Sequence, residues 1–486
     1  MNKLRQEWLG NVRGDILAGI VVFMALIPEV MGFSIVAGVD PMVGIYASFC
    51  MTLITAIFGG RPGLISAAAG ATALVLASLV RDYGIEYMLA ATILTGFLQV
   101  VFGFLKIGNL LKFIPKPVMI GFVNALGIMM LQSQLAHFQG PISLLVLAGL
   151  GISIIYLLPR VTTKIPSPIV AIATITVIVF IFDIDIQTLG DMGTITSTLP
   201  SFLIPNIPFN LETLAIIFPY ALSVSIVGIV ESLLTAQLVD EMTQTDSDKN
   251  QECVGQGLAN IVSGFFGGIA GCGMIGQTMV NMNYGGRGRL SSVVAGSLML
   301  GSALLFSDFL VQIPIVALAA VMVVVSITTF NWESLRRLKH VPVSDTMTML
   351  VTVIVVLGTH NLAYGVVAGC ILSALFFVSK LSKINVTFTD GEMPTFVVSG
   401  QLFFASTTTF MQALNQDIQT KEVCIDFSNV RIIDDSAVDA IDKVVIRYHQ
   451  KGIKTTLVGL SDECQQLLDK LAVHNKPGGL TKTLSH

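Results

Sequence analysis

The sequence predicts a polytopic α-helical membrane domain followed by a small soluble α/β domain. Hydrophobic residues make up 53% of the chain and charged residues 12%, and the mean hydropathy is +0.79, values typical of membrane proteins. After Lys380 the pattern changes to short alternating runs, which are typical of strands and helices in a soluble domain. We therefore expect a transmembrane domain over residues 1–383 and a second domain over residues 384–486.

Apolar runs recur through the transmembrane domain, most of them near or below the ~20 residues of one upright span. When the shorter Gly-rich runs are counted with them, we expect about fourteen crossings, some of them incomplete. Six of the runs are Leu89–Val101, Val118–Leu131, Leu144–Leu158, Ile169–Phe182, Ser292–Phe306 and Ile313–Ile327.

Basic side chains are distributed unevenly over the connections between these crossings. With the N-terminus inside, the predicted outer connections hold one of them, Arg81, and the long outer connection Asp183–Glu212 has none. An excess of Lys and Arg marks cytoplasmic loops, so both termini are expected in the cytoplasm. The predicted inner connections hold seventeen basic residues: Lys3, Arg5, Arg13, Arg61, Lys106, Lys112, Lys116, Arg160, Lys164, Lys249, Arg287, Arg289, Arg336, Arg337, Lys339, Lys380 and Lys383.

The second domain is expected to be a small α/β sheet, because strand-like and helix-like runs alternate along it. About one hundred residues are enough for an independent hydrophobic core. The expected strands are Thr395–Val398, Val423–Phe427 and Thr455–Val458, and the expected helices are Thr407–Asn415, Ser436–Tyr448 and Asp462–Leu471.

Two carboxylates, Glu29 and Glu231, lie inside segments that are apolar enough to cross a bilayer, where a charge is costly and usually functional. The offset between them is 202 residues. Gly-interrupted hydrophobic segments at matching positions of two halves point to the binding site of a transporter. Each glutamate is followed by a Gly-Gly pair and then by a Gly-x-Thr triplet. The two pairs, Gly59-Gly60 and Gly267-Gly268, are 208 residues apart. The two triplets, Gly70-Ala71-Thr72 and Gly276-Gln277-Thr278, are 206 residues apart.

The two Gly-rich stretches, 65–73 and 265–278, are expected to leave the helical conformation at membrane depth. Backbone does so only where it is buried in protein or lines a cavity. An extended stretch that then becomes a helix presents unpaired N–H groups and the positive end of the helix dipole. Two such ends facing each other would form an anion site without a basic side chain. The alternative is small-residue helix packing of the GxxxG type.

Glu231 is followed four residues later by Thr235, which lies on the same helical face. A carboxylate and a hydroxyl one turn apart could hold Na⁺ or a proton. Because an ionised Glu231 would repel an anionic substrate, a cation bound beside it would favour entry of the anion, which is a rationale for symport. Glu29 follows Pro28, where a kink could shape the cavity. For both carboxyl groups the alternative is a hydrogen bond within the helical bundle.

Six motifs together resemble the sulfate permease (SulP) family, the bacterial relatives of solute carrier family 26, and the resemblance runs from end to end of the chain. The motifs are Asp15-Ile16-Leu17-Ala18-Gly19, Ile27-Pro28-Glu29, Pro41-Met42-Val43-Gly44-Ile45-Tyr46-Ala47, Gly59-Gly60-Arg61-Pro62-Gly63, Glu231-Ser232-Leu233-Leu234 and Gly285-Gly286-Arg287-Gly288-Arg289. The resemblance implies fourteen transmembrane segments in a seven-plus-seven inverted repeat like that of uracil transporters, with core and gate domains. The repeats would cover about 1–185 and 210–383.

The family binds its substrate between the N-termini of the third and tenth helices and has an acidic residue on the eighth, which here is Glu231. The Na⁺-dependent bicarbonate members usually have Asp at that position, Thr one turn on and Thr at the end of the tenth-helix motif. This chain keeps Thr235 but has Ile275 at the last position, so the resemblance favours protons as the coupling ion. The implied substrate-binding residues are Ala69, Gly70, Ala71, Thr72, Gly273, Met274 and Ile275.

Residues 423–437 resemble the central signature of STAS domains of the anti-sigma-factor-antagonist type: a strand, Asp426-Phe427-Ser428, an apolar pair, and Asp435-Ser436-Ala437 opening a helix. In the antagonists the serine after that aspartate is phosphorylated, and its equivalent here is Ser436. A phosphate is favourably placed at a helix N-terminus. The alternative is a plain helix cap supplied by Asp435 or Ser436.

Together these inferences predict a secondary active symporter, coupled to H⁺, that moves small anions such as sulfate, bicarbonate or a dicarboxylate by an elevator-type motion. It would lie in the inner membrane of a bacterial cell. The alternatives are a Na⁺-coupled bicarbonate importer, an anion exchanger or uncoupled pathway, and a membrane sensor that signals through its STAS domain.

An enzyme is not expected, because the six histidines, including His137, His340 and His360, form no pattern of metal ligands or of nucleophile and base. The six cysteines have no metal-ligand spacing either. No cofactor beyond the coupling ion is expected. The expected partners are the anion, membrane lipid, a second copy of the chain in a homodimer and a cytoplasmic protein bound through the STAS domain, with no nucleic acid.

Overall fold

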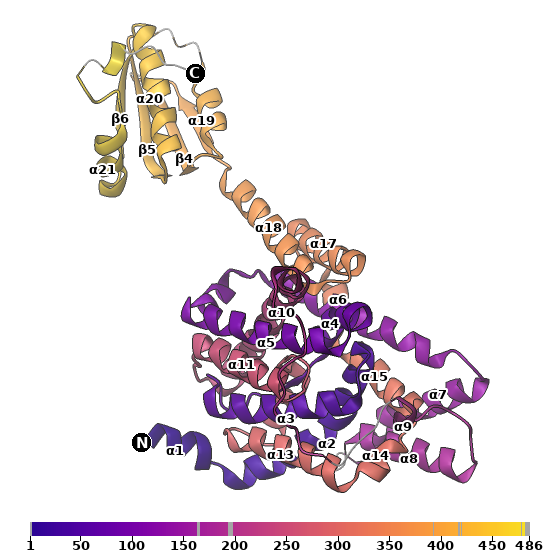
Figure 1. Ribbon diagram of the computed structural model, residues 1–486. Coiled ribbons are helices and arrows are strands. Elements are labelled where there is room, and N and C mark those ends of the chain that lie inside the picture. The colour runs from indigo at the N-terminus through magenta and orange to yellow at the C-terminus, as the bar shows by residue number, and fades with distance from the viewer. Residues whose placement is uncertain are drawn as a thin grey trace. The chain divides into compact units, whose positions relative to one another are not determined.

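The computed structural model describes residues 2–162, 166–192, 198–391, 393–416, 418, 420–477 and 479–481 (Figure 1). They fall into two compact units, Met1–Cys370 and Ile371–His486, and each unit has its own hydrophobic core. Lys164, part of the connection Asp183–Glu212 and the last five residues of the expected second domain lie outside the described residues.

Eight helical stretches among the described residues are long and apolar enough to cross a membrane. Their helices are α2 (Val12–Ala37), α3 (Pro41–Phe58), α5 (Ile85–Phe104), α6 (Lys116–Gln134), α7 (Ile142–Leu157), α10 (Leu211–Thr243), α15 (Ile315–Thr329) and α18 (Leu362–Leu381). Three shorter apolar helices are α8 (Ser167–Ile181), α13 (Leu290–Leu305) and α17 (Val343–Thr359). The expected helical membrane domain is therefore confirmed, while the count of fourteen crossings stays a prediction.

Shorter elements connect these helices. They are α1 (Asn2–Leu9), α4 (Gly70–Tyr83), α9 (Leu189–Met192), α11 (Lys249–Phe265), α12 (Ile275–Asn283), α14 (Ser307–Val311), α16 (Trp332–Arg337) and the 3₁₀ helices η1 (Ile107–Phe113), η2 (Leu135–Phe138) and η3 (Leu158–Arg160). All six apolar runs named from the sequence coincide with helices, extending at most two residues beyond them.

Several helix ends follow directly from the local sequence. Asp40 caps α3 by accepting a hydrogen bond from the amide of Met42 at 2.8 Å, with Pro41 at the first helical position. Asn210 caps α10 in the same way. Helix α2 ends at Gly38, whose φ of +74° is readily adopted only by glycine.

One order of elements occurs twice in the first unit. A long helix with an internal proline is followed by a second helix, a three-residue strand, a short helix and another helix. The first set is α2, α3, β1 (Ser66–Ala68), α4 and α5, and the second is α10, α11, β2 (Gly271–Gly273), α12 and α13. The two strands pair antiparallel, and the inverted relation of the two halves stays a prediction.

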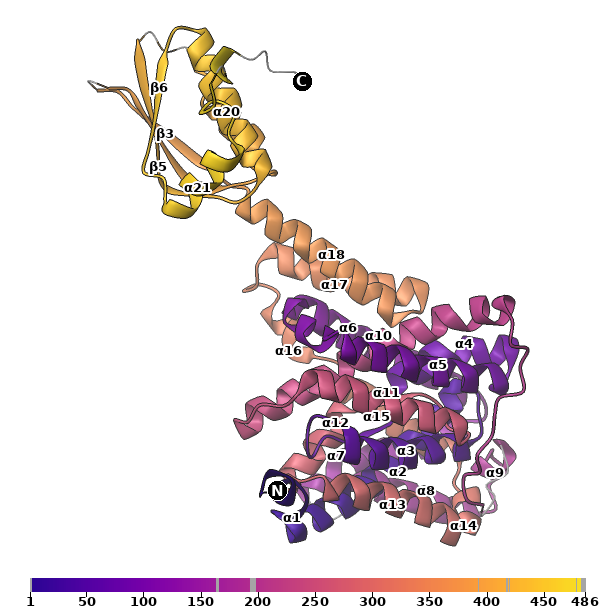
Figure 2. The same ribbon diagram turned by 60° about the vertical axis from the view of Figure 1, so that its left-hand side comes forward.

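The second unit contains a four-stranded sheet in the order β3-β4-β5-β6, and α20 lies along one face of it (Figure 2). β3 is antiparallel to β4, and the pairs β4–β5 and β5–β6 are parallel. The strands are β3 (Asn385–Thr389), β4 (Thr395–Leu402), β5 (Glu422–Ile432) and β6 (Lys454–Val458), and the helices are α19 (Thr407–Ala413), α20 (Asp435–Gln450), α21 (Asp462–Leu471) and η4 (Gly479–Thr481).

All six elements expected in this unit are present, with boundaries that differ by a few residues. The sequence prediction missed β3, an edge strand with an exposed polar face. Phe396, Phe410, Phe427 and Tyr448 are the largest fully buried side chains here, and they give this small unit a core of its own.

Candidate functional site

Two short strands, β1 and β2, pair at the centre of the repeated elements. The register places Ser66 opposite Gly273, Ala67 opposite Cys272 and Ala68 opposite Gly271. All six residues are buried. Each strand leads within two residues into a helix, β1 into α4 and β2 into α12. The structure therefore has the extended-then-helical geometry expected from both Gly-rich stretches.

Among the described residues, the N-termini of α4 and α12 have no side-chain cap, since the capping positions are held by Ala69 and Met274 in extended conformation. The first backbone N–H groups of each helix are therefore free of a side-chain acceptor, and the positive end of each helix dipole lies there. Because both helices start from a shared two-stranded ribbon, these two ends are held by one element.

The two helix starts differ in exposure. Gly276, in the first turn of α12, is exposed, and a Cβ atom added there would meet no described neighbouring atom within 4 Å. A Cβ atom on Gly70 would lie 2.8 Å from the ring of Phe33 and 3.2 Å from the sulfur of Met130. The predicted binding residues 69–72 are all buried, whereas Ile275 is half-buried. In this structure α12 offers the open helix end.

The threonines of the two Gly-x-Thr triplets reach across to the opposite half. The hydroxyl of Thr72 donates to the carbonyl oxygen of Ala270 at 2.6 Å. The hydroxyl oxygen of Thr278 accepts a hydrogen bond from the amide of Ile65 at 3.0 Å. The triplets found by spacing in the sequence thus hold the strand pair together.

Helix α10 packs on β2 through consecutive polar side chains. Glu231 is 8% exposed, and the thiol of Cys272 donates to its Oε2 at 3.1 Å. Ser232 accepts a hydrogen bond from the amide of Gly273 at 2.8 Å. The predicted carboxylate therefore lies directly beside the strand that leads into α12. The Cys272 bond was not foreseen, because a cysteine in an apolar run is usually a small core residue.

Thr235 and Glu29 lie against the same ribbon and helix. The Thr235 hydroxyl is 2.8 Å from the carbonyl oxygen of Glu231 and 3.1 Å from that of Gly273, so it binds backbone and not the Glu231 carboxylate. The carboxyl group of Glu29 in α2 contacts the side chain of Gln277 in the first turn of α12. The two glutamates singled out from the sequence thus both contact the second Gly-rich stretch, Glu231 at Cys272 and Glu29 at Gln277.

Helix α11 supports this arrangement through a polar stripe that the sequence analysis missed. Glu252 accepts hydrogen bonds from the amides of Gly60 and Arg61, and Gln256 donates to Ser66 Oγ at 2.6 Å. Farther along, Asn260 bonds both the amide and the carbonyl of Gly271, and Ser263 bonds the carbonyl of Ile269. The spacing 252, 256, 260 and 263 follows one helical face and could have been recognised from the sequence.

Glycine-mediated helix packing, the alternative explanation for the Gly-rich stretches, occurs elsewhere in this unit. A Cβ atom on Gly96 would lie 2.4 Å from the carbonyl oxygen of Gly257, and one on Gly257 would lie 2.6 Å from that of Gly96. These residues let α5 and α11 approach closely. Gly276 has no such neighbour, so packing does not account for it.

Ser436 lies in the second unit, at the second residue of α20, and is exposed. The cap of this helix is Asp434, whose Oδ1 accepts a hydrogen bond from the amide of Ala437 at 2.9 Å. The suggested cap by Asp435 or Ser436 is therefore wrong. The Ser436 hydroxyl makes no hydrogen bond among the residues that the structure describes. Nearby in the signature, two hydrogen bonds from Ser428 hold the pKa of Asp426 below its usual range.

Comparison with known proteins identifies the family. The model of the sulfate permease family matches residues 12–144 and 139–352, and that of the STAS domain matches residues 383–485. The chain belongs to the sulfate permease family. It is 52% identical to the protein named "Putative sulfate transporter YbaR" of Bacillus subtilis (strain 168), over 96% of this chain and 99% of that one. The family resemblance drawn from the motifs is confirmed.

Three further matches extend along most of this chain. The protein named bicarbonate transporter BicA of Synechocystis sp. is 26% identical, over 95% of this chain and 91% of that one. The solved transmembrane domain of a cyanobacterial BicA matches with a TM-score of 0.66 at 26% identity, over 75% of this chain and 98% of that one. Murine solute carrier 26 family member A9, an anion transporter solved in the inward-facing state, shares the fold, with a TM-score of 0.82 at 18% identity, over 96% and 88% of the two chains.

Proposed function

We propose that this member of the family is a secondary active transporter that moves small inorganic or carboxylate anions, such as sulfate, bicarbonate or a dicarboxylate. The observation that carries the proposal is the N-terminus of α12 at Gly276, which is open, has no side-chain cap among the described residues and is joined to the start of α4 through the β1–β2 ribbon. Backbone N–H groups at a helix N-terminus bind anions without a basic side chain. Ala69, Gly70, Ala71, Thr72, Gly273, Met274 and Ile275 are the residues proposed to surround the anion.

We propose proton symport with Glu231 as the proton carrier. Its carboxyl group is nearly buried beside β2, and its one hydrogen bond among the described residues comes from the Cys272 thiol. An ionised Glu231 beside the anion would repel it, and a proton on Glu231 removes that repulsion. Glu29, in contact with Gln277, is the second candidate carrier.

Sodium-coupled bicarbonate import is the second candidate function. The similarity to a protein named bicarbonate transporter favours it. So does the Thr235 hydroxyl, which lies near the carbonyl oxygens of Glu231 and Gly273, since oxygen ligands are what a hard cation prefers. Exchange or uncoupled passage remains the third outcome of the experiment below.

For the motion, we propose an elevator in which α2–α5 and α10–α13 carry the ribbon past the remaining membrane helices. The two sets share the ribbon through the Thr72–Ala270 and Thr278–Ile65 bonds, which favours their movement as one body. We further propose that residues 1–383 form the transport domain and that residues 384–486 form a cytoplasmic STAS domain. That domain would bind a partner protein and be phosphorylated at Ser436, in a homodimer in the inner membrane with both termini in the cytoplasm.

The test is uptake of labelled sulfate, bicarbonate and fumarate into proteoliposomes that hold the full chain, with a pH gradient or a Na⁺ gradient as the only driving force. Accumulation driven by the pH gradient supports proton symport and names the substrate. Accumulation driven by Na⁺ alone supports the bicarbonate-importer alternative. Uptake that follows neither gradient contradicts coupling through Glu231, and absence of uptake of all three anions contradicts the proposed substrate class.

A further inference from the structure

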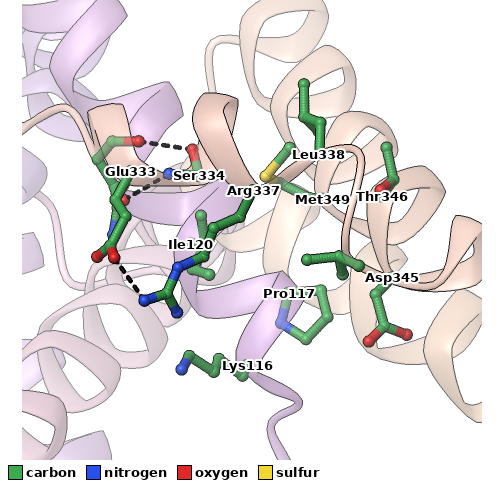
Figure 3. A pocket seen from close by; sticks show the side chains of 12 residues that line it. Lys116, Pro117, Ile120, Glu333, Ser334, Arg337, Leu338, Asp345, Thr346 and Met349 are labelled. Atoms are coloured by element: carbon green, nitrogen blue, oxygen red, sulfur yellow. Dashed lines mark hydrogen bonds and ion pairs between the residues drawn. The ribbon is translucent and has the colours of Figure 1, made fainter.

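A pocket of about 280 Å³ lies in the first unit where α6 begins, around α16 and at the start of α17 (Figure 3). One part of its wall is apolar and is made of Pro117, Ile120, Leu338, Val341 and Met349. Two cationic side chains, Lys116 and Arg337, also line it, as Figure 3 shows. The pocket therefore combines a charged portion with an apolar wall.

The cations of this pocket are available to a ligand. Lys116 is exposed and forms no ion pair among the described residues. The Arg337 guanidinium contacts Glu333 through one nitrogen at 2.5 Å, and both side chains are more than half exposed, so its other N–H donors can bind an anion. The second acid of the lining, Asp345, accepts a hydrogen bond from Ser344 at 3.1 Å.

The surrounding segment adds positive charge. Arg336 and Lys339 flank Arg337 and form no ion pair among the residues described here. With Lys116 and Arg337 they make four cations against the two acids Glu333 and Asp345. Helices α6 and α17 also begin beside this pocket, each without a side-chain cap among the described residues, so the positive ends of two helix dipoles lie near its lining.

The segment has the composition of a membrane interface. Trp332 is 53% exposed, Leu335 46% and Val343 78%. Exposed tryptophan and aliphatic side chains next to Lys and Arg are typical of segments that lie at the boundary between lipid headgroups and acyl chains. The cation distribution along the sequence predicts that this boundary faces the cytoplasm. Basic pockets between membrane helices on that side bind lipid headgroups.

We propose that this pocket binds the phosphate diester of an anionic phospholipid headgroup. The Lys116 ammonium and the free donors of Arg337 would bind the phosphate oxygens. The glycerol backbone and the first acyl carbons would pack against the apolar wall at Ile120 and Met349. Neither the anion site at Gly276 nor the coupling ion takes part, so this proposal stands apart from the proposed transport function.

The test compares lipid binding to the purified full chain by native mass spectrometry, with phosphatidylglycerol, phosphatidylethanolamine and phosphatidylcholine as probes. The variants are Lys116→Gln and Arg337→Gln. The matched control is Arg336→Gln, which removes the same charge from the same helix but outside the pocket lining. We expect each pocket variant to lower phosphatidylglycerol occupancy about fivefold, the contribution of one cation near an anionic lipid surface. The control should lower it much less.

Equal losses in Arg336→Gln and Arg337→Gln would mean a diffuse surface attraction and would overturn the pocket. Equal occupancy by phosphatidylethanolamine and phosphatidylglycerol would overturn selection for an anionic headgroup. Inorganic phosphate tests whether the pocket binds a lipid headgroup or a free phosphate ion, because a free phosphate ion has no apolar part that could pack against the apolar wall. We expect it to leave bound phosphatidylglycerol in place, and displacement at equal concentration would overturn the assignment to lipid.

Discussion

The hydroxyl of Thr72 lies 2.6 Å from the carbonyl oxygen of Ala270, a residue 198 positions further along the chain. Ala270 directly precedes β2, and Thr72 lies in the first turn of α4. Thr278 makes the reciprocal contact by accepting a hydrogen bond from Ile65, which directly precedes β1. The ribbon that positions both helix ends is therefore held by one hydrogen bond between the threonine of each half and the backbone of the other half.

Replacing Thr72 by valine should destabilise the membrane unit. Valine has nearly the same shape but cannot donate to Ala270, so a buried hydrogen bond is lost at a cost of about 1–3 kcal/mol. The midpoint of thermal unfolding of the purified full chain should fall. Thr72→Ser keeps the hydroxyl and should stay near the native midpoint. An unchanged midpoint in Thr72→Val would mean that the bond does not stabilise the ribbon.

Gly276→Leu should weaken anion binding without loss of folding. A Cβ atom here meets no described atom within 4 Å, so we expect a leucine side chain to fit and to cover the N–H groups at the start of α12. Losing one hydrogen bond to a charged group, worth about 1.5–3 kcal/mol, should weaken anion affinity about tenfold or more. Binding of labelled sulfate or bicarbonate to the purified protein, with its thermal midpoint, measures both effects.

Gly301→Leu is the matched control for this substitution. Gly301 lies in α13 and, like Gly276, has no described neighbour within 4 Å of an added Cβ atom, but it does not lie at a helix N-terminus. It should fold and bind anions as the native chain does. Native affinity in Gly276→Leu would exclude this helix end as the anion site.

Glu231→Gln should abolish accumulation driven by an ion gradient while the protein still folds. Glutamine has a similar volume and still accepts a hydrogen bond from Cys272, but it cannot carry a proton. Glu241→Gln is the control, because Glu241 lies exposed on the same helix. Uptake into proteoliposomes under a pH gradient should be lost in the first variant and kept in the second. Concentrative uptake by Glu231→Gln would exclude this carboxyl group as the coupling residue.

Much of this site was predictable because its signals are local and repeated. Glu29, Glu231 and the two Gly-x-Thr triplets are conspicuous in apolar sequence, and their matching offsets indicate two equivalent halves. Their mutual contacts were not predictable, since bonds such as Thr72–Ala270 depend on tertiary folding. The open helix end at Gly276 was missed for the same reason: only packing of Phe33 and Met130 against Gly70 distinguishes the two halves.

The other differences between the sequence predictions and the structure also have physical causes. The polar residues on one face of α11 look unfavourable for a membrane helix. Their role becomes visible only in the folded structure, where they form hydrogen bonds with residues of the β1–β2 ribbon. Strand β3 has little apolar alternation, because it pairs on one edge with β4 and exposes most of its side chains. The cap of α20 is Asp434 and not one of the two predicted residues, because the helix begins one residue earlier than the hydrophobic pattern suggested.

Tyr448 should make the stability of the second unit depend on alkaline pH. It is 1% exposed and donates to the carbonyl oxygen of Leu414 at 2.6 Å. Burial raises the pKa of Tyr448 to about 12, opposed by the nearby Arg447, while an unfolded tyrosine has a pKa of about 10. Because the folded value is higher, the neutral phenol stabilises the fold fully below about pH 10 and loses that effect as the pH rises toward 12.

The fragment 383–486, which contains the second unit's own core, allows a direct measurement. Tyr448 is its one tyrosine and it has no tryptophan, so the tyrosinate absorbance reports this phenol alone. The folded fragment should titrate near pH 12 and the fragment in denaturant near pH 10. Tyr448→Phe should lower stability at neutral pH by about 1 kcal/mol, the net contribution of one hydrogen bond. A folded fragment that titrates near pH 10 would mean that the phenol is open to solvent, and the packing of α20 against α19 would then be wrong.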